Sequence, residues 1–272
     1  MAFMSRYVAK KPDSKGMIQY EEEENHIWHV LYQRQIDLLP KRACDEFIQG
    51  LDLLALTSDR IPQLPDLSQR LKKLTGWEIV PVAALISARE FFGLLAHRQF
   101  PAATFIRHID ELNYVKEPDI FHELFGHCPM LTNPVYADFV HQYAVLVLSF
   151  PEVDWPLLQR LFWFTVEFGL IKTKAGLRAY GGGILSSILE TSYSVESDEA
   201  MRVMFDPVVV FRTPYRIDRL QSIYFVIDDY QILYDFVHLN VGALMERARK
   251  LGEYPALFPV DLNNPNIHIL AC

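Results

Sequence analysis

The chain has 272 residues, half of them hydrophobic, and its 34 acidic and 26 basic side chains give a net charge of −8. This balance argues against nucleic acid as a partner, because phosphate binding requires a basic face, and no apolar run approaches the length of about 20 residues needed to cross a bilayer. The three cysteines are scattered and the first residues lack the apolar stretch of a secretory signal, so we expect free thiols and a cytoplasmic protein.

The composition and the hydrophobic periodicity predict one mainly α domain with a few short strands. This domain is expected over residues 21–272, after a flexible segment over residues 1–20. Its first helix is expected over residues 21–38, where an acidic run suits a helix N-terminus. Asp66 is expected to cap the next helix, which ends at Gly76.

Further helix starts are predicted from capping residues. Ser87 followed by Glu90 is a capping-box pattern, and Asn133 before Pro134 combines an N-cap with a proline in the first turn. The predicted elements that follow are a helix from Asp154 to Phe168, a hairpin over residues 170–180, a strand over residues 208–211 and an amphipathic helix over residues 228–251.

Two histidines, His122 and His127, stand in the acidic and aromatic segment of residues 118–127. Their spacing is one residue longer than in the H-E-x-x-H pattern of zinc peptidases. Five residues of an α-helix advance by about 500°, which leaves about 140° between the two rings. The pair therefore reaches one metal ion only at a helix end or a local distortion, which Gly126 would permit. Hydrogen-bonded surface or core histidines are the alternative.

Glu167 is the one carboxylate in the apolar and aromatic run of residues 161–171. A helix that is apolar on every face is buried, and an unpaired buried carboxylate is costly, so Glu167 requires a cation. An arginine is one candidate. A metal that also binds the two imidazoles is the better candidate, because two histidines and one carboxylate form the ligand set of oxygen-activating non-haem iron.

Three consecutive glycines occupy positions 181–183. Such a run can form a phosphate-binding loop, but neither the Walker lysine nor the G-x-G-x-x-G pattern accompanies it here. We therefore expect the glycines to permit a close approach of the backbone to a bound group or to another helix.

The chain resembles the catalytic domain of the tetrahydropterin-dependent aromatic amino acid hydroxylases, most closely the bacterial-type phenylalanine hydroxylases. The matching segments extend over about residues 76–230 and follow the order of the family: residues 81–91, 105–108, 117–127, 163–169 and 179–187. The resemblance implies a mainly α catalytic domain. It also implies a mono-oxygenase that uses Fe(II), O₂ and tetrahydrobiopterin or a related tetrahydropterin.

By this resemblance, His122, His127 and Glu167 are the iron ligands. Ser186 is expected to assist catalysis from a position near His122. Glu123 is expected to lie between the pterin and the iron as a second catalytic residue.

The resemblance also assigns residues to the two organic ligands. Arg107 would bind the substrate carboxylate through its planar guanidinium, and Asp119 would support Arg107. The other residues expected to bind the substrate are Pro118, Trp163, Phe168 and Ser186. Those expected to bind the pterin are Phe91, which would stack on it, and Leu85, Ile86, Ala88 and Glu123.

The implied reaction is the hydroxylation of free L-phenylalanine to L-tyrosine, a step of phenylalanine catabolism. Apolar Ile217 lies where tyrosine-specific relatives carry an acidic residue, which favours phenylalanine over tyrosine or tryptophan. Asp218 comes next, so a one-residue shift of the loop would reverse this preference. Phe162 and Val115 depart from the family pattern, since many relatives have tyrosine and threonine there, and each departure removes a hydroxyl at the edge of the pocket.

Two other functions are compatible with the same residues. A zinc hydrolase can use two histidines and a glutamate, with Glu123 as general base, although the histidine spacing argues against it. A helical binding module could keep the scaffold without catalysis.

The expected partners are the amino acid, O₂ and the pterin, with no nucleic acid or membrane. The chain has no room for the regulatory domain and tetramer-forming helix of animal relatives, so a monomer or a small homo-oligomer such as a dimer is expected.

Overall fold

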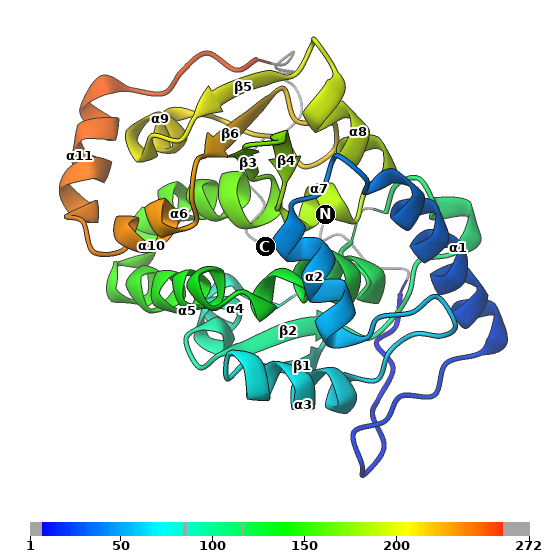
Figure 1. Ribbon diagram of the computed structural model, residues 1–272. Helices are drawn as coiled ribbons and strands as arrows, with labels where there is room; N and C mark the ends of the chain where they lie inside the picture. The colour runs from blue at the N-terminus through cyan, green and yellow to red at the C-terminus, as the bar shows by residue number, and fades with distance from the viewer. Residues whose placement is uncertain (1–6, 84–85, 116, 258–272) are drawn as a thin grey trace.

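The computed structural model describes residues 7–83, 86–115 and 117–257. The chain forms helices around two small sheets (Figure 1), which confirms the mainly α fold that the sequence predicts. Leu85, one of the residues expected to bind the pterin, lies outside the described residues. Within the described ranges, no helix is both long and apolar enough to span a bilayer.

The secondary structure of the described residues is as follows. The α-helices are α1 (Glu22–Leu38), α2 (Asp45–Leu54), α3 (Leu64–Leu74), α4 (Ala88–Leu95), α5 (Pro134–Ser149), α6 (Trp155–Phe162), α7 (Gly182–Leu185), α8 (Ile188–Glu196), α9 (Pro207–Arg212), α10 (Gln231–Phe236) and α11 (Val241–Leu251). The π-helices are η2 (His122–His127) and η5 (Trp163–Glu167), and the 3-10 helices are η1 (Ile109–Glu111), η3 (Met130–Thr132) and η4 (Glu152–Asp154). The strands are β1 (Glu78–Val82), β2 (Gln99–Ala103), β3 (Leu170–Thr173), β4 (Gly176–Ala179), β5 (Met201–Met204) and β6 (Ile223–Ile227).

The larger sheet has the strand order β4-β3-β6-β5. Strands β3 and β4 form the antiparallel hairpin predicted for residues 170–180, and β6 runs parallel to both β3 and β5. All five residues of β6 are buried. A continuous apolar run of this kind is typical of a strand that is covered on both faces. The smaller sheet pairs β1 with β2 in parallel.

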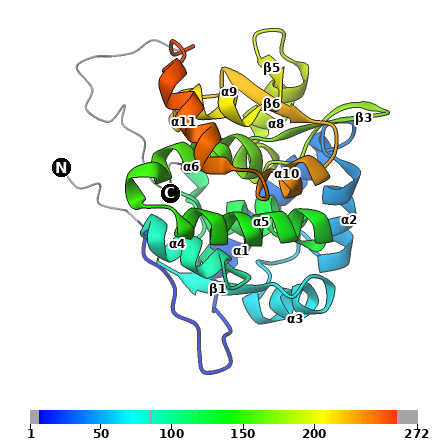
Figure 2. The ribbon, with the colours of Figure 1, turned by 90° about the vertical axis from the view of Figure 1, so that its left-hand side faces the viewer.

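The short helices in the middle of the chain lie between the two sheets. Figures 1 and 2 show β1 and β2 at one end of the molecule and the larger sheet toward the other, with α5 between them. Helix α7 packs against η2 and η5, while β2 contacts η2 and β6 contacts η5. Both π-helices are therefore held from several sides by the core.

Three predicted helix starts are confirmed. Helix α1 occupies nearly the whole predicted range and begins with a capping box between Glu21 and Glu24. Ser87 accepts a hydrogen bond from the backbone N–H of Glu90 at the start of α4, and Asn133 caps α5 in the same way. Each cap satisfies an amide of the first turn that has no partner within the helix.

The prediction of a strand over residues 208–211 is wrong. These residues belong to α9, because Asp206 accepts hydrogen bonds from the backbone N–H groups of Val208 and Val209 and so caps a helix. The β-branched composition favours a strand. The cap and the proline at the first helical position outweigh that local preference.

Two helix boundaries also differ from the prediction. Residues 228–251 form two helices, because α10 ends at Phe236 and Asn240 caps a separate helix α11. Helix α3 begins three residues earlier than expected, so Asp66 lies in its first turn and is not its cap.

The segment of residues 7–20 contains neither helix nor strand, and it contacts the loop after β2. The ring of Tyr7 stacks on Phe105 and His108, with centroid distances of 4.4 and 5.1 Å. Thr104 Oγ1 donates a hydrogen bond to the carbonyl of Lys10. The division into a flexible segment over residues 1–20 and one domain after it stays a prediction.

Two helical glycines give a matched test of the packing. A Cβ added at Gly50 in α2 would lie 2.2 Å from the carbonyl oxygen of Pro129, whereas one added at Gly93 in α4 would have no neighbour within 4 Å. We expect Gly93→Ala to raise the free energy of unfolding by about 0.5–1 kcal/mol. Gly50→Ala is expected to lower it by about 1–3 kcal/mol, because the backbone of Pro129 must move. Denaturant unfolding followed by circular dichroism measures both, and equal stability of the two variants would contradict this packing.

Candidate metal centre

The histidine pair lies on a π-helix rather than on an α-helix. In η2 the hydrogen bonds join residues five apart, as the Cys128 N–H shows by donating to Glu123 O at 3.3 Å. Residues five apart are then one turn apart, so His122 and His127 share a face of the helix. Their Nε2 atoms lie 3.0 Å from each other. The distortion that convergence requires is therefore present along the whole segment.

Glycines allow helix α7 to lie against η2. A Cβ at Gly126 would come within 2.7 Å of the carbonyl oxygen of Gly182, and one at Gly182 would come within 2.4 Å of the His127 ring. The glycine run at positions 181–183 thus permits close backbone approach, as predicted. It also fixes one face of the His127 imidazole.

The second π-helix, η5, brings Glu167 to the two histidines. Its carboxylate oxygens lie 3.3 Å from His127 Nε2 and 3.6 Å from His122 Nε2. Two donor atoms that each bind one ion at about 2.1 Å, at angles of about 90–110°, are separated by about 3.0–3.4 Å. Because the three measured distances lie close to this range, His122, His127 and Glu167 fit a single metal ion.

The protonation of His122 is set by its neighbours. The Ser186 hydroxyl donates to Gly182 O at 2.8 Å, so it must accept the hydrogen bond from His122 Nδ1, also at 2.8 Å. This tautomer leaves a lone pair on Nε2, which faces His127 and Glu167. Burial, together with the nearby His127, lowers the pKa of His122 to about 4, so the ring is neutral at pH 7. A neutral imidazole is the form that binds metals.

The pKa values of the two carboxyl groups of the site, Glu167 and Glu123, are shifted in opposite directions. Burial raises the pKa of Glu167, but His127 and His122 outweigh that effect and hold the pKa below its ordinary value. Burial raises the pKa of Glu123 well above its usual range, and the charges of Glu167 and Asp119 raise it further. Glu123 also has an oxygen within 4.8 Å of both histidine ligand atoms. Glu167 is the better third ligand, because its lowered pKa favours the ionised carboxylate, whereas the pKa of Glu123 is raised.

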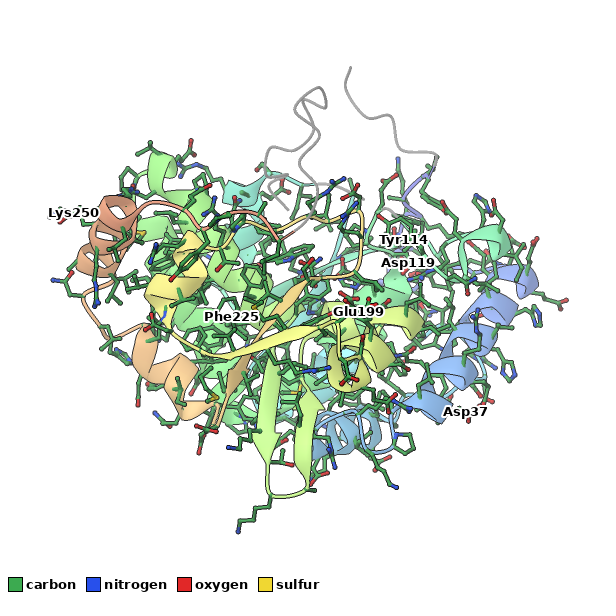
Figure 3. All side chains as sticks on the ribbon, turned by 90° about the horizontal axis from the view of Figure 1, so that it is seen from above. Asp37, Tyr114, Asp119, Glu199, Phe225 and Lys250 are labelled. Atoms are coloured by element: carbon green, nitrogen blue, oxygen red, sulfur yellow. The ribbon has the colours of Figure 1, made fainter. Side chains whose placement is uncertain are left out.

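Arg107 and Asp119 form a buried ion pair beside the histidines. Arg107 Nε and Nη2 donate to the two carboxylate oxygens at 2.7 and 2.8 Å, and the backbone N–H of Arg107 donates at 2.9 Å. Asp119 also accepts from the N–H of His122 at 3.0 Å, and Arg107 holds the pKa of Asp119 below its ordinary value against the effect of burial. Figure 3 labels Asp119 and Tyr114 on the same side of the molecule. Among the described residues, no acceptor binds Arg107 Nη1, which leaves that end of the fork for an anion.

Aromatic side chains follow the same five-residue spacing. Trp163 and Phe168 stand at the two ends of η5, with ring centroids 4.6 Å apart, and Phe168 N–H donates to Trp163 O at 2.9 Å. The other face of Trp163 stacks on Tyr215 at 4.6 Å. Pro118 is half-buried and directly precedes Asp119.

The residues expected to bind the pterin lie around the start of α4. Phe91 is half-buried and packs edge-on against Phe92 and Phe162 at 5.4 Å each. Ile86 and Ala88 are half-buried just before it. The described ring contacts of Phe91 are with these two phenylalanines, rather than with the three metal-ligand candidates.

The sequence does not predict the role of Gln221, a buried residue of this region. Gln221 Oε1 accepts the indole N–H of Trp163 at 3.0 Å. A lone glutamine between a loop and a strand belongs to no motif, so no signal in the sequence predicts this role.

Comparisons with known proteins show the family of the chain. A family model for biopterin-dependent aromatic amino acid hydroxylases matches residues 4–244. A Pseudomonas aeruginosa protein named phenylalanine-4-hydroxylase is 48% identical over 255 residues, which are 94% of this chain and 97% of that protein. The solved phenylalanine hydroxylase of Legionella pneumophila is 68% identical with a TM-score of 0.92, over 93% of this chain and 100% of that chain. A Chromobacterium violaceum phenylalanine hydroxylase, solved with iron(III) and 7,8-dihydrobiopterin, is 41% identical with a TM-score of 0.84, over 93% of each chain.

The buried ion pair yields a prediction about stability. Asp119→Asn leaves Arg107 buried without a counter-charge, so we expect the free energy of unfolding to fall by about 3–5 kcal/mol at pH 7. The exposed pair between Arg216 and Asp218 gives a control, and Asp218→Asn is expected to cost less than about 1 kcal/mol.

The same variant has a predicted pH dependence. Because the folded-state pKa of Asp119 is lowered, its stabilising effect is present above the unfolded pKa and is lost as the pH falls through the folded pKa. The difference between wild type and Asp119→Asn should therefore shrink toward low pH. Urea unfolding at several pH values measures it, and a difference that grows on acidification would contradict the pairing.

Proposed function

The chain belongs to the biopterin-dependent aromatic amino acid hydroxylases, and we propose from this premise that it hydroxylates the ring of free L-phenylalanine to L-tyrosine with O₂, Fe(II) and a tetrahydropterin. The observation that best supports this reaction is the triangle of ligand atoms from His122, His127 and Glu167, with sides of 3.0, 3.3 and 3.6 Å. Two imidazoles and one carboxylate leave other positions around an ion open, as oxygen-activating iron requires.

His122, His127 and Glu167 are the residues that would hold the iron. Their fit rests on the donor chemistry: two imidazoles, of which His122 is neutral and held in one tautomer by Ser186, and one ionised carboxylate. When bound, the iron and the reduced pterin supply the activation of O₂. The side chains of the protein keep the ligand atoms fixed and surround them with largely buried residues.

Arg107 would bind the carboxylate of the amino acid. Asp119 occupies one edge of the guanidinium, which fixes the plane of the fork and leaves Nη1 for the substrate. Trp163, Phe168 and Pro118 would then surround the ring of the substrate. Because Asp119 also accepts from the N–H of His122, one carboxylate ties the substrate-binding arginine to the metal site.

The pterin would lie on the other side of the metal, against Phe91. The residues that would form its loop are Leu85, Ile86 and Ala88. Glu123 would lie between the pterin and the iron, and burial, which raises its pKa, favours the protonated carboxyl, a form that can donate a hydrogen bond. Ser186 would act through His122, whose ring it orients.

Other functions find less support. The comparisons give the zinc hydrolase no support, since the matching family and the similar proteins are hydroxylases. A binding module without catalysis does not need two buried imidazoles turned toward one ionised carboxylate.

We place the enzyme in the cytoplasm as a monomer or dimer. The net charge of −8 argues against nucleic acid. Cys44 and Cys128 are buried free thiols, as is usual in a reducing compartment.

Loss of a metal ligand should remove the iron. We expect His122→Ala, His127→Ala and Glu167→Ala each to retain almost no iron after anaerobic loading and desalting, because two remaining ligands hold the ion too weakly. Ser186→Ala removes only the support of one ligand, so it should weaken iron binding by about 10- to 100-fold. His141→Ala, a histidine outside the site, is the control. Iron is measured per chain by mass spectrometry, and full iron in any ligand variant would refute that ligand.

The substrate assignment is tested by competition between amino acids. With phenylalanine and tyrosine at equal concentration, iron, O₂ and a tetrahydropterin, we expect phenylalanine to react about 5- to 100-fold faster, because half-buried Ile217 offers no partner to a phenol hydroxyl. Ile217→Asp should reduce this preference. Oxygen uptake must accompany tyrosine formation, whereas hydrolysis without oxygen uptake would favour the zinc enzyme. Equal rates for both amino acids would refute the role of Ile217 but not that of the iron ligands.

A further inference from the structure

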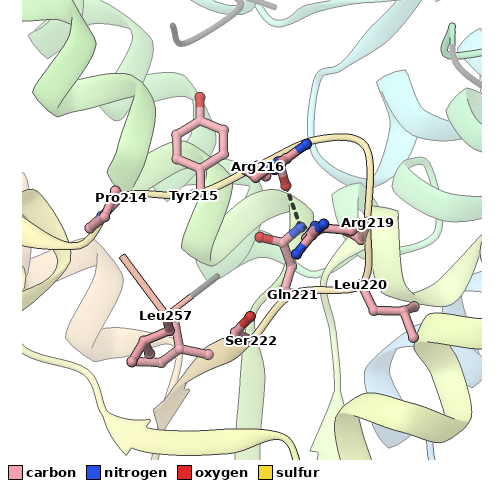
Figure 4. Close-up of a pocket in the computed structure, with 9 residues that line it drawn as sticks. Pro214, Tyr215, Arg216, Arg219, Leu220, Gln221, Ser222 and Leu257 are labelled. Carbon is pink, nitrogen blue, oxygen red and sulfur yellow. Dashed lines mark hydrogen bonds between the residues drawn. The ribbon is translucent and has the colours of Figure 1, made fainter. Parts of the chain in front are cut away.

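Gln221 lies buried at the point where the loop after α9 leads into β6. Its Oε1 accepts the indole N–H of Trp163 at 3.0 Å. Its Nε2 donates to the carbonyl oxygens of Arg216 and Arg219 at 2.7 and 3.2 Å. Figure 4 shows the side chain of Gln221 in the bend of this loop, with the bond to Arg216 dashed. One amide thus joins the loop, which includes Ile217, to an aromatic ring on another element.

The backbone of Gln221 is itself fixed from the core. Its N–H donates to a carboxyl oxygen of Glu190 on α8 at 2.9 Å, and both residues are buried. Burial raises the pKa of Glu190 to about 7, against the lowering effect of the Gln221 N–H. The glutamine is therefore anchored to a helix of the core before it reaches Trp163 and the loop.

Trp163 connects Gln221 to the proposed metal site through Phe168. Its ring lies between Tyr215 and Phe168, each at a centroid distance of 4.6 Å. A Cβ at Gly183 would come within 2.9 Å of Phe168 and 3.0 Å of Glu167 Oε2, so these two side chains lie against the same point of α7. A displacement of the indole would consequently move Phe168, which lies next to the proposed metal ligand Glu167.

The loop borders a small pocket, which is partly lined by Arg219, Gln221 and Ser222 (Figure 4). Asp218, Arg219 and Leu220 are exposed, and the residues from 213 to 222 form no helix or strand. The ion pair between Arg216 and Asp218 and the hydrogen bond from the Tyr114 hydroxyl to the carbonyl of Ile217 also hold the loop. The amide of Gln221 adds a link from the loop to the indole N–H of Trp163.

We propose that Gln221 is a positioning residue that determines substrate preference: its amide holds the Trp163 wall of the aromatic pocket and the loop with Ile217 at a fixed distance from each other. This inference rests on the proposed hydroxylase function. A purely structural glutamine would contribute to stability alone. A positioning glutamine also sets how the pocket fits the ring of the amino acid.

The first variant is Gln221→Met, which keeps the length and volume of the side chain and removes all three hydrogen bonds. We expect the KM for phenylalanine to rise about tenfold, with a smaller change in kcat, and the preference for phenylalanine over tyrosine to fall. The iron content should not change. Gln35→Met is the matched control, because Gln35 is equally buried and bonds to Thr191 between α1 and α8. It should cost stability without altering the preference.

The second variant, Gln221→Glu, separates the two halves of the role. A glutamate still accepts from Trp163, but its other oxygen would face the carbonyls of Arg216 and Arg219. We expect the indole to stay in place while the loop is released, so that the preference between amino acids changes more than the KM for phenylalanine.

The indole N–H of Trp163 gives a readout that does not depend on turnover. In ¹⁵N-tryptophan-labelled protein its NMR signal is identified by its absence in Trp163→Phe. It should move to lower frequency in Gln221→Met and stay close to its wild-type position in Gln221→Glu. Trp163→Phe combined with Gln221→Met should cost less than the sum of the single changes, because both remove the same bond.

These measurements distinguish the inference from the proposed function. If the wild type hydroxylates no aromatic amino acid, the proposed function fails, while an unmoved indole signal in Gln221→Met would separately refute the anchoring. If the wild type is active and both Gln221 variants keep its KM and its preference, the positioning role is wrong. The same conclusion follows if Gln35→Met changes the preference as much as Gln221→Met.

Discussion

The structure depends on one geometrical constraint: three side chains on two helices must point at a single spot in the interior. Residues five apart on an α-helix face nearly opposite directions, so His122 and His127 cannot meet on one. The chain meets the constraint by winding η2 as a π-helix, in which residues five apart share a face. Such winding leaves less room for neighbours, and glycines at 126 and 182 supply that room. Strands β2 and β6 and helices α6 and α7 then hold the two short π-helices in place.

The same winding serves a second purpose in η5. It ends at Glu167, and it also brings the rings of Trp163 and Phe168 together across five residues. The proposed metal ligand and the proposed aromatic wall thus lie on one irregular turn. If η5 were wound as an α-helix, the rings of Trp163 and Phe168 would separate and Glu167 would turn away from the two histidines. Backbone geometry therefore couples the proposed metal site to the proposed aromatic pocket.

Much of this was predictable, and the exceptions have physical causes. Caps such as Ser87 and Asn133 are local, so their helices were found from the sequence. The cap at Asp206 was missed because the β-branched run after it favours a strand, and the break at Asn240 was missed because apolar periodicity continues across it. His122, His127 and Glu167 were identified as candidate ligands from their residue types and surroundings, and the other candidate site residues followed from the resemblance. The sequence showed that a distortion near Gly126 was needed, but the form of the distortion depends on α7 packing from 60 residues away. Gln221 could not be found, because its partners are a carboxyl, an indole and two carbonyls from distant or irregular segments.

The pKa values of four carboxyl groups in the interior are shifted differently according to their neighbours. Arg107 lowers the pKa of Asp119, and the two histidines lower that of Glu167. Burial and the charges of Glu167 and Asp119 raise the pKa of Glu123. Glu190 has only an amide N–H and lies between these extremes, with a pKa of about 7. A buried carboxyl therefore takes the charge that its nearest donors can support. Asp119 has the guanidinium of Arg107 beside it, and Glu167 has two imidazoles that could share a metal ion with it. The ionised carboxylates therefore lie where an arginine is oriented and where we propose that a cation binds.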